Sequence, residues 1–197
     1  PASHPDYILN LLEVCKKSGI HIILPLVTKE LFPLSENKNL FLKNNIKVLV
    51  SDYKYLSIAN NKSKLYDFLY ANDIEVPPFK IVNSVSDFKQ AVLSLGYPQN
   101  TICFKPSVSN GSRGFRIISD SENKLDLLFN HKPNSTYIGF EEILKTLSSG
   151  SFPELLVSEV LPGEEFSVDC LANNGEAVLV IPRLRKKIIG GISVEGE

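Results

Sequence analysis

Short apolar runs alternate with helix-like segments at the start of this chain, and this alternation most limits what it can fold into. Residues 20–26 and 46–50 are nearly continuous apolar runs, whereas residues 6–18 and 29–44 carry apolar side chains at helical spacing. Strands that are apolar on both faces and alternate with helices are typical of a parallel sheet covered on both sides. We therefore predict an α-β-α-β block that lacks the first β-α part of a doubly wound domain.

The rest of the chain predicts a mixed α/β and α+β arrangement. A helix is expected to begin at Ser84, because Ser84 and Asp87 form a capping-box-like pattern, and to end at Gly96. The buried residues predicted on it are Phe88, Ala91, Val92 and Leu95. Further helices are predicted at 57–72, 122–130 and 140–147, and strands at 79–82, 101–105, 114–119, 155–160, 165–172 and 176–185.

Composition excludes several classes of protein. The 197 residues are 43% apolar and 22% charged, which suits one large or two small soluble domains. A net charge of −1 argues against nucleic-acid binding. No apolar run approaches the ~20 residues needed to span a bilayer, and no signal peptide is visible. We expect a cytoplasmic protein without nucleic-acid or membrane partners.

The cysteines and histidines show no ligand spacing, so no metal site is predicted from them. The three cysteines, Cys15, Cys103 and Cys170, are expected to be buried, reduced thiols. The chain has no methionine, opens with Pro-Ala-Ser and closes with Gly-Glu without a finishing element. This composition predicts a fragment of a longer protein.

A lysine precedes a flexible loop in the stretch CFKPSVSNGSRGFRII at residues 103–118. The dipeptide Asn110-Gly111 is a strong hairpin signal, so the loop is expected to join two antiparallel strands. Backbone N–H groups of a Ser/Gly loop can approach phosphate oxygens closely, and Lys105 would add a positive charge. A plain hairpin whose lysine reaches solvent explains the pattern about as well.

A strand, a Pro-Gly turn and another strand follow in residues 158–169. The turn leaves Glu159 and Glu165 on either side of the apolar pair Val160-Leu161. Such a turn could offer backbone groups to an adenine edge and a carboxylate to ribose hydroxyls. A surface turn with solvated acids is the simpler interpretation of this segment taken alone.

Four stretches in this order and spacing resemble the ATP-grasp superfamily, and most closely its carbamoyl-phosphate-synthase large-chain-like group. They are DYKYLSIANNKSKLYDFLYANDIEVPPFK at 52–80, ICFKPSVSNGSRGFRII at 102–118, LLVSEVLPGEEFSVDCL at 155–171 and VIPRLRKKIIGGIS at 180–193. The resemblance implies three parts. They are the end of a Rossmann-like pre-ATP-grasp domain at 1–56, a linker helix and ATP-grasp lid subdomain at 57–160, and the start of the second ATP-grasp subdomain at 161–197.

The resemblance also implies roles for individual residues. Lys62 and Lys105 are expected to reach the nucleotide phosphates, and Glu165 the ribose. Glu159, Val160 and Leu161 correspond to the adenine hinge. The flexible loop over the phosphates would comprise Ser109, Asn110, Gly111, Ser112 and Gly114.

A basic run near the end of the chain would face an anionic substrate or the γ-phosphate. We expect Arg183 and Arg185 on one strand face, in a catalytic role, and Lys186 on the other. A solvated basic edge strand remains an alternative for Lys186 and Lys187. The family holds Mg²⁺ with acidic residues and an asparagine further along than Glu197, so no metal ligand is assigned here.

The resemblance implies an ATP-dependent ligase that activates a carboxylate or bicarbonate as an acyl phosphate for attack by an amine or ammonia. ATP, Mg²⁺ and small carboxylate and amine substrates are then the expected partners, and a homodimer is compatible with the sequence. As a fragment, the chain is expected to bind nucleotide weakly and not to catalyse. The alternatives are a non-catalytic nucleotide-binding module and a kinase-like phosphotransferase.

Overall fold

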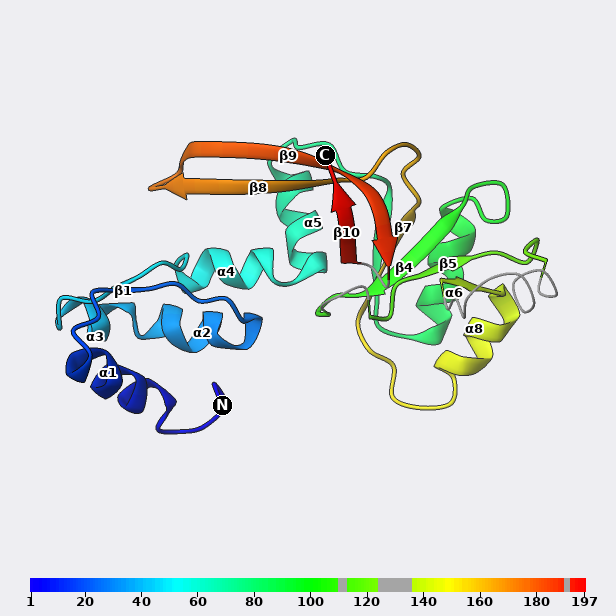
Figure 1. Ribbon diagram of the computed structural model, residues 1–197. Coiled ribbons are helices and arrows are strands. Elements are labelled where there is room, and N and C mark those ends of the chain that lie inside the picture. Colours follow the sequence, from blue (N-terminus) through cyan, green and yellow to red (C-terminus); the bar gives the residue numbers. More distant parts are fainter. Residues whose placement is uncertain (110–112, 124–135, 190–191) are drawn as a thin grey trace. The chain divides into compact units, whose positions relative to one another are not determined.

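The computed structural model describes residues 1–109, 113–123, 136–189 and 192–197 (Figure 1). The chain divides into two compact units, Pro1–Phe68 and Leu69–Glu197, and helix α5 (Lys62–Ala71) crosses the boundary between them. The predicted helix at 122–130 falls mostly outside the described residues. No helix in the described ranges is both long and apolar enough to cross a membrane.

The first unit holds a two-stranded parallel sheet, as the alternating pattern predicted. Its core comprises side chains from the helices and from the second strand, with Phe41 and Leu34 almost completely buried. Besides the start of α5, the elements are α1 (Tyr7–Lys17), β1 (Ile22–Ile23), α2 (Thr28–Glu36), α3 (Lys38–Leu42), β2 (Lys47–Val48) and α4 (Tyr53–Ala59).

Two predictions for this unit are wrong in detail. The run at 20–26 forms only the short strand β1. Leu24 and Leu26 are 62% and 84% exposed, so the prediction that both faces of the sheet are covered does not hold for this run. Helices expected to be continuous are each divided in two. Asn37 separates α2 from α3, and Asn60 ends α4 just before α5 begins. Asparagine side chains bond to nearby backbone groups and so favour such breaks.

The second unit contains a five-stranded mixed sheet with strand order β3-β7-β4-β5-β6. Its neighbouring strands pair antiparallel except β5 and β6, which are parallel. Helices α6 and α8 pack on one face of this sheet and complete a single apolar core (Figure 1). The elements are β3 (Phe79–Val82), α6 (Val85–Ser94), β4 (Ile102–Pro106), β5 (Arg116–Ile118), β6 (Tyr137–Ile138), α8 (Phe140–Leu147) and β7 (Leu155–Glu159).

Helix α6 forms as the sequence predicted. The Ser84 side chain accepts a hydrogen bond from the Asp87 backbone N–H at 3.0 Å, which satisfies a donor that the first helical turn would otherwise leave unbonded. Gly96, just beyond the helix, has a φ of 99°, a conformation that favours glycine. All four residues predicted to be buried on this helix are buried: Phe88, Ala91, Val92 and Leu95.

A three-stranded antiparallel sheet, in the order β10-β9-β8, occupies the remaining residues of the second unit. Its strands are β8 (Phe166–Asn173), β9 (Glu176–Ile189) and β10 (Ile192–Gly196), and β8 and β9 form a long hairpin (Figure 1). The hairpin turns at Asn174 and Gly175, which both have positive φ, as the sequence Asn-Asn-Gly favours. Residues 192–196 therefore lie in a strand, contrary to the prediction that the last residues form no element.

Cys170 is exposed, which corrects the prediction that all three cysteines are buried thiols. Cys15 and Cys103 are buried, and all three are free. The difference follows from the location of Cys170 on β8, a strand on which apolar side chains such as Val168 and Leu171 are themselves more than half exposed.

Candidate nucleotide-binding site

The pairing of β4 with β7 gives the five-stranded sheet two chemically different faces. Ile102 and Phe104 point into the core, where the ring of Phe104 meets that of Phe88 edge to face at 5.2 Å. Successive side chains of a strand point to opposite faces, so Cys103 and Lys105 lie on the face away from the core. Lys105 is only partly buried there, which suits a charged group directed at a ligand.

Cys103 and Ser158 form a buried polar pair on this second face. They lie opposite each other in the β4–β7 ladder, and their Sγ and Oγ atoms are 3.5 Å apart. Burial raises the pKa of the Cys103 thiol, while the hydrogen bond to Ser158 and the positive charge of Lys105 act to lower that pKa. Lys105 is thus near enough to the Cys103 thiol to affect its pKa.

The predicted adenine hinge begins where β7 ends, and its first backbone groups are already bonded. The Val160 N–H donates to the carbonyl of Thr101 at 2.9 Å, and the Glu159 N–H donates to the carbonyl of Pro78 at 3.3 Å. Leu161 follows with 67% of its surface exposed. The hinge is thus fixed on one side by the starts of β3 and β4 and projects into solvent at Leu161.

The Glu159 side chain is held by a residue that sequence analysis did not select. Asn100 Nδ2 donates to Glu159 Oε1 at 3.0 Å and to the Leu95 carbonyl at 2.9 Å. Asn100 precedes β4, and its partner lies 59 positions further along the chain. No spacing pattern in the sequence could have indicated this contact.

The predicted phosphate loop joins β4 to β5, which pair antiparallel as expected for a hairpin. Ser109 is partly buried, and Gly114 has a φ of 79°. A Cβ atom on Gly114 would lie 2.6 Å from Pro106 Cγ, so a side chain at this position would be both strained and in collision. The other predicted loop residues lie outside the described residues: Asn110, Gly111 and Ser112.

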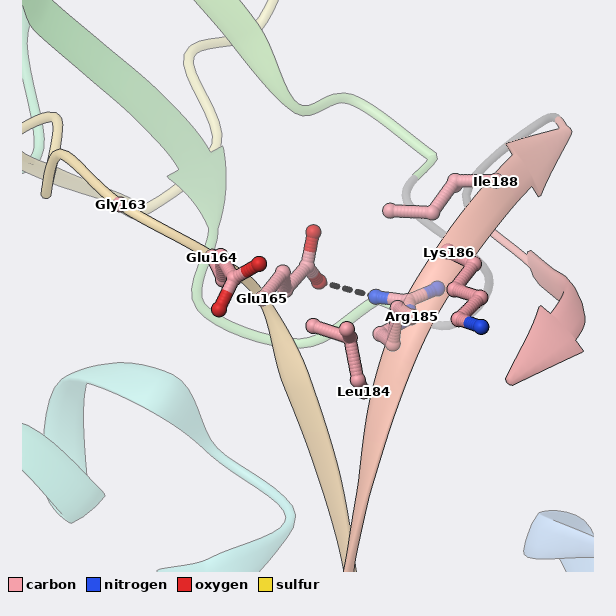
Figure 2. Close-up of a pocket in the computed structure, with 7 residues that line it drawn as sticks. All are labelled: Gly163, Glu164, Glu165, Leu184, Arg185, Lys186 and Ile188. Atoms are coloured by element: carbon pink, nitrogen blue, oxygen red, sulfur yellow. Dashed lines mark hydrogen bonds and ion pairs between the residues drawn. The ribbon is translucent and has the colours of Figure 1, made fainter. Parts of the chain in front are cut away.

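Glu165 and Arg185 form an ion pair at the base of the β8–β9 hairpin (Figure 2). Their strands are also joined there by a backbone hydrogen bond from the Arg185 N–H to the Glu165 carbonyl at 2.9 Å. The Arg185 side chain is only 14% exposed, whereas that of Glu165 is 59% exposed. Both residues line an open pocket of about 530 Å³, together with Gly163, Glu164, Leu184, Lys186 and Ile188.

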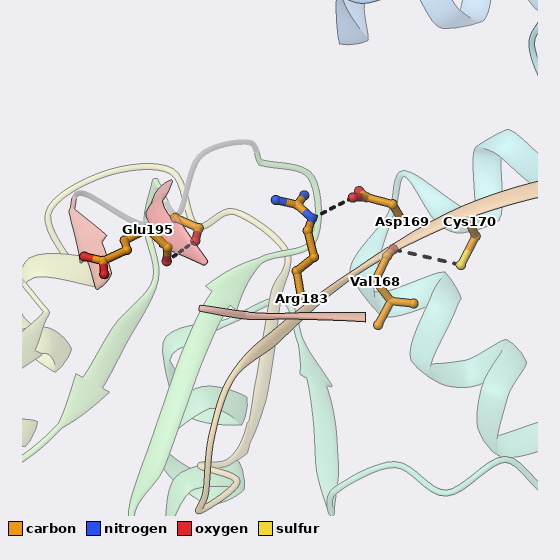
Figure 3. Close-up of polar contacts among 6 residues, drawn as sticks. Val168, Asp169, Cys170, Arg183 and Glu195 are labelled. Atoms are coloured by element: carbon orange, nitrogen blue, oxygen red, sulfur yellow. Dashed lines mark hydrogen bonds and ion pairs between the residues drawn. The ribbon is translucent and has the colours of Figure 1, made fainter. Parts of the chain in front are cut away.

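The other predicted basic residues on β9 also have carboxylate partners. Arg183 Nε donates to Asp169 Oδ2 at 2.8 Å across the hairpin (Figure 3), and Lys186 pairs with Glu197. These cations are therefore held by cross-strand pairing. The pairing of β9 with β8 ends at Leu184, and beyond it β9 pairs with β10. Lys186 and Lys187 are both exposed there, so the alternative of a solvated basic edge strand stays open for these two lysines.

Lys62 is the first residue of α5 and is partly buried. Asn61 caps this helix start, because its Oδ1 accepts the Lys64 backbone N–H at 3.0 Å. The sequence predicted one uninterrupted helix at residues 57–72. In the structure a separate helix begins at Lys62, so this residue lies at a helix N-terminus that the sequence pattern did not reveal.

The structure thus brings together two groups of predicted residues within the second unit. Lys105 lies on the strand that pairs with the hinge strand, and Glu165 contacts Arg185. Sequence reasoning missed the residues that support them, namely Asn100, Cys103, Ser158 and Asp169. Across the described ranges, no group of three His, Cys, Asp or Glu side chains is placed to hold a metal ion.

Two family descriptions match parts of this chain. Residues 151–195 match "ATP-grasp in the biosynthetic pathway with Ter operon", and residues 1–49 match "PylC-like, N-terminal domain". The carbamoyl phosphate synthase large chain of Thermoanaerobacter pseudethanolicus is 25% identical over 173 residues. That alignment covers 88% of this chain but only 14% of the relative.

Solved structures share the fold. N5-carboxyaminoimidazole synthetase of Staphylococcus aureus, complexed with ADP, aligns with a TM-score of 0.61 at 16% identity, over 98% of this chain and 43% of that one. Biotin carboxylase of Campylobacter jejuni, as its β-γ-ATP complex, aligns with a TM-score of 0.62 at 17% identity, over 95% of this chain and 40% of that one. By sequence the chain is similar to carbamoyl phosphate synthase large chains and to an ATP-grasp family model, and its fold is similar to that of the two solved enzymes.

Proposed function

We propose that this chain forms the nucleotide-binding part of an ATP-grasp ligase. The ligase would activate a carboxylate or bicarbonate as an acyl phosphate, which an amine or ammonia then attacks. The chain spans 14% of the length of the carbamoyl phosphate synthase large chains that match most of it, so the reaction and its substrates are proposals throughout. In the same proposal, residues 1–56 end a Rossmann-like domain, residues 57–160 form the lid part, and residues 161–197 begin the second ATP-grasp subdomain.

The register between β4 and β7 carries this proposal. It pairs Ile102 with Glu159 and Lys105 with Leu156. At roughly 3.3 Å per residue, the lysine therefore lies about 10 Å along the sheet from the start of the hinge. A nucleotide whose base sits at the hinge would extend along this face with its phosphates towards Lys105.

The hinge backbone would select adenine. Because the Glu159 and Val160 N–H groups are already bonded, we assign base recognition to the Val160 carbonyl and the Leu161 N–H. This acceptor–donor pair complements the amino group and ring nitrogen of adenine, whereas guanine presents the opposite pattern there. Glu165 would accept hydrogen bonds from the ribose hydroxyls.

The chemistry of the transfer depends on charge rather than on covalent help from the protein. Lys105 and the amides of the 109–114 loop would neutralise phosphate oxygens, and Lys62 is a second candidate for this role. Arg183 and Arg185 would offer guanidinium groups to an anionic substrate. When bound, Mg²⁺ would supply positive charge that helps to neutralise the phosphates. Among the described residues, no group of carboxylates is placed to hold this ion, so no residue of this chain is assigned as its ligand.

Calorimetric titration with ATP and GTP tests base recognition. The account predicts that ATP binds at least about tenfold more tightly than GTP, a difference of ~1.4 kcal/mol. Equal affinities would contradict the hinge assignment, and absence of binding by either nucleotide would contradict the proposed function.

Trapping with hydroxylamine tests the reaction class in a longer protein that carries this sequence, because the 197 residues alone are expected to bind nucleotide without catalysing. A ligase that forms an acyl phosphate converts ATP, a carboxylate and hydroxylamine into a hydroxamate, ADP and inorganic phosphate. With bicarbonate as the substrate, the trapped product is N-hydroxycarbamate in place of the hydroxamate. Nucleotide binding without either product would favour the non-catalytic module. A stable phosphorylated product without hydroxamate would favour the kinase-like alternative.

A further inference from the structure

The ion pair between Glu165 and Arg185 joins two groups to which the proposed function gives different ligands. Glu165 is the acid proposed to bind ribose, and Arg185 is proposed to face an anion. In the structure each group is occupied by the other (Figure 2). A ribose whose hydroxyls donate hydrogen bonds to the Glu165 carboxylate therefore competes with Arg185 for that carboxylate.

We propose that Arg185 forms an oxyanion site that opens when a nucleoside engages Glu165, so that nucleoside and oxyanion bind cooperatively. The inference rests on the proposed function, because it takes Glu165 as the ribose-binding acid. It adds that binding of the nucleoside strengthens binding of the oxyanion, an effect that neither Glu165 nor Arg185 would produce alone.

The burial of the two side chains explains the coupling. Arg185 is 14% exposed, and a nearly buried guanidinium that loses its carboxylate partner is strongly destabilised. A phosphate or carboxylate oxyanion can replace that partner, because the planar guanidinium matches two oxygens at once. Glu165 is 59% exposed and can turn towards a ligand without leaving water.

The backbone at this position can stay in place while the side chains of Glu165 and Arg185 change partners. The hydrogen bond from the Arg185 N–H to the Glu165 carbonyl holds the two strands together independently of the side chains. The pocket around the pair is open and already contains a second cation, Lys186, and a second carboxylate, Glu164. Lys186 pairs with Glu197, so its charge remains compensated when the Glu165–Arg185 pair separates.

The coupling must be reciprocal. If an oxyanion strengthens nucleoside binding by some factor, the nucleoside strengthens oxyanion binding by the same factor. The oxyanion can come from the nucleotide's own phosphates or from a carboxylate substrate, since both present the same chemistry to Arg185. Adenosine separates these sources, because it carries ribose but no phosphate.

The experiment measures adenosine affinity by calorimetry with inorganic phosphate, with acetate, or with chloride at the same ionic strength. Arg185→Gln is the test variant, and Arg185→Lys keeps the charge without the guanidinium fork. Arg116→Gln is the matched control, because it removes an arginine of β5 that the proposed function does not use and that donates to the Phe115 carbonyl. Thermal unfolding of each variant shows which of them remain folded.

We expect phosphate or acetate to raise adenosine affinity at least about fivefold in the wild-type chain and in Arg116→Gln. The gain should vanish in Arg185→Gln and shrink in Arg185→Lys. A gain with phosphate alone identifies the nucleotide's phosphates as the source, and a gain with acetate alone identifies the carboxylate substrate. Adenosine binding that no anion changes overturns the coupling but leaves the nucleotide site intact. If neither adenosine nor ATP binds, the proposed function fails and the coupling fails with it.

Discussion

Tyr97 donates its phenol hydroxyl to Asp120 Oδ2 at 2.6 Å, while Asp120 Oδ1 accepts the backbone N–H of Phe140 at 3.0 Å. The rings of Tyr97 and Phe140 also pack together, with centroids 5.2 Å apart. One carboxylate therefore connects the segment after α6 to the first turn of α8. This contact stabilises the covered face of the sheet whose other face carries Lys105.

Removing the Tyr97 hydroxyl should destabilise the second unit. Tyr97→Phe keeps the ring packing but deletes a hydrogen bond to a carboxylate, so the free energy of unfolding should fall by about 1.5 kcal/mol. Urea denaturation followed by circular dichroism measures this change. Tyr137→Phe, on the outer strand β6, is the matched control and should be nearly neutral. Equal effects of the two substitutions would contradict the role given to Asp120.

The same tyrosine should make stability depend on alkaline pH. Burial, reinforced by the hydrogen bond to Asp120, raises the pKa of Tyr97 from 10.0 to about 12. The folded state thus holds the phenol proton more tightly than the unfolded state does. Its stabilising contribution is complete below pH 10 and is lost as the pH rises through about 12.

Comparison of the wild-type chain with Tyr97→Phe isolates the contribution of the Tyr97 hydroxyl to this pH dependence. Their difference in unfolding free energy should stay constant below pH 10 and shrink as the pH rises from 10.0 to about 12. A difference that stays constant over this interval would show that Tyr97 titrates normally.

The N-cap of α6 gives a third prediction. Ser84→Ala removes the acceptor for the Asp87 N–H and should cost about 1 kcal/mol of unfolding free energy. Ser86→Ala changes a solvent-exposed serine within the same helix and serves as the control. Guanidinium denaturation of both variants measures the free energy of unfolding. If Ser86→Ala lowers it as much as Ser84→Ala does, the cap contributes nothing to stability.

Gly114 should be intolerant of any side chain. Its φ is 79°, and a Cβ added there would lie 2.7 Å from Pro106 Cδ, so Gly114→Ala should lose more than ~1 kcal/mol of unfolding free energy. Gly150→Ala is the control, because a Cβ there meets no atom within 4 Å. Adding Pro106→Ala should restore part of the stability of Gly114→Ala, as read by thermal unfolding. Strict additivity of the two changes would rule out the collision.

The sequence predicted those parts of the fold that depend on interactions between residues close together in the chain. The Ser84 cap, the four buried residues of α6 and the turn at Asn174-Gly175 follow from side-chain chemistry within a few residues, and each is observed. Helix α8 was predicted with its observed bounds, Phe140–Leu147, because its apolar residues follow helical spacing closely.

Features that depend on distant partners could not be predicted. Asn100 meets Glu159 across 59 positions, and the pairing of Glu165 with Arg185 depends on the register of the β8–β9 hairpin. The exposure of Cys170 depends on which sheet β8 joins, which its alternating sequence does not specify. The family resemblance selected the hinge and the ribose acid, but not the residues that hold them.

The most direct test of the account is thermal unfolding with and without ATP and Mg²⁺, for the wild-type chain, Lys105→Ala and Lys89→Ala. Lys89 is an exposed lysine of α6 and provides the matched control. At ~100 times its Kd, a ligand specific for the folded state adds about 2.7 kcal/mol, which raises the unfolding temperature by several degrees. The account predicts this rise in the wild-type chain and in Lys89→Ala, and its loss in Lys105→Ala. A rise of equal size in all three proteins would contradict the assignment of Lys105 to the nucleotide phosphates.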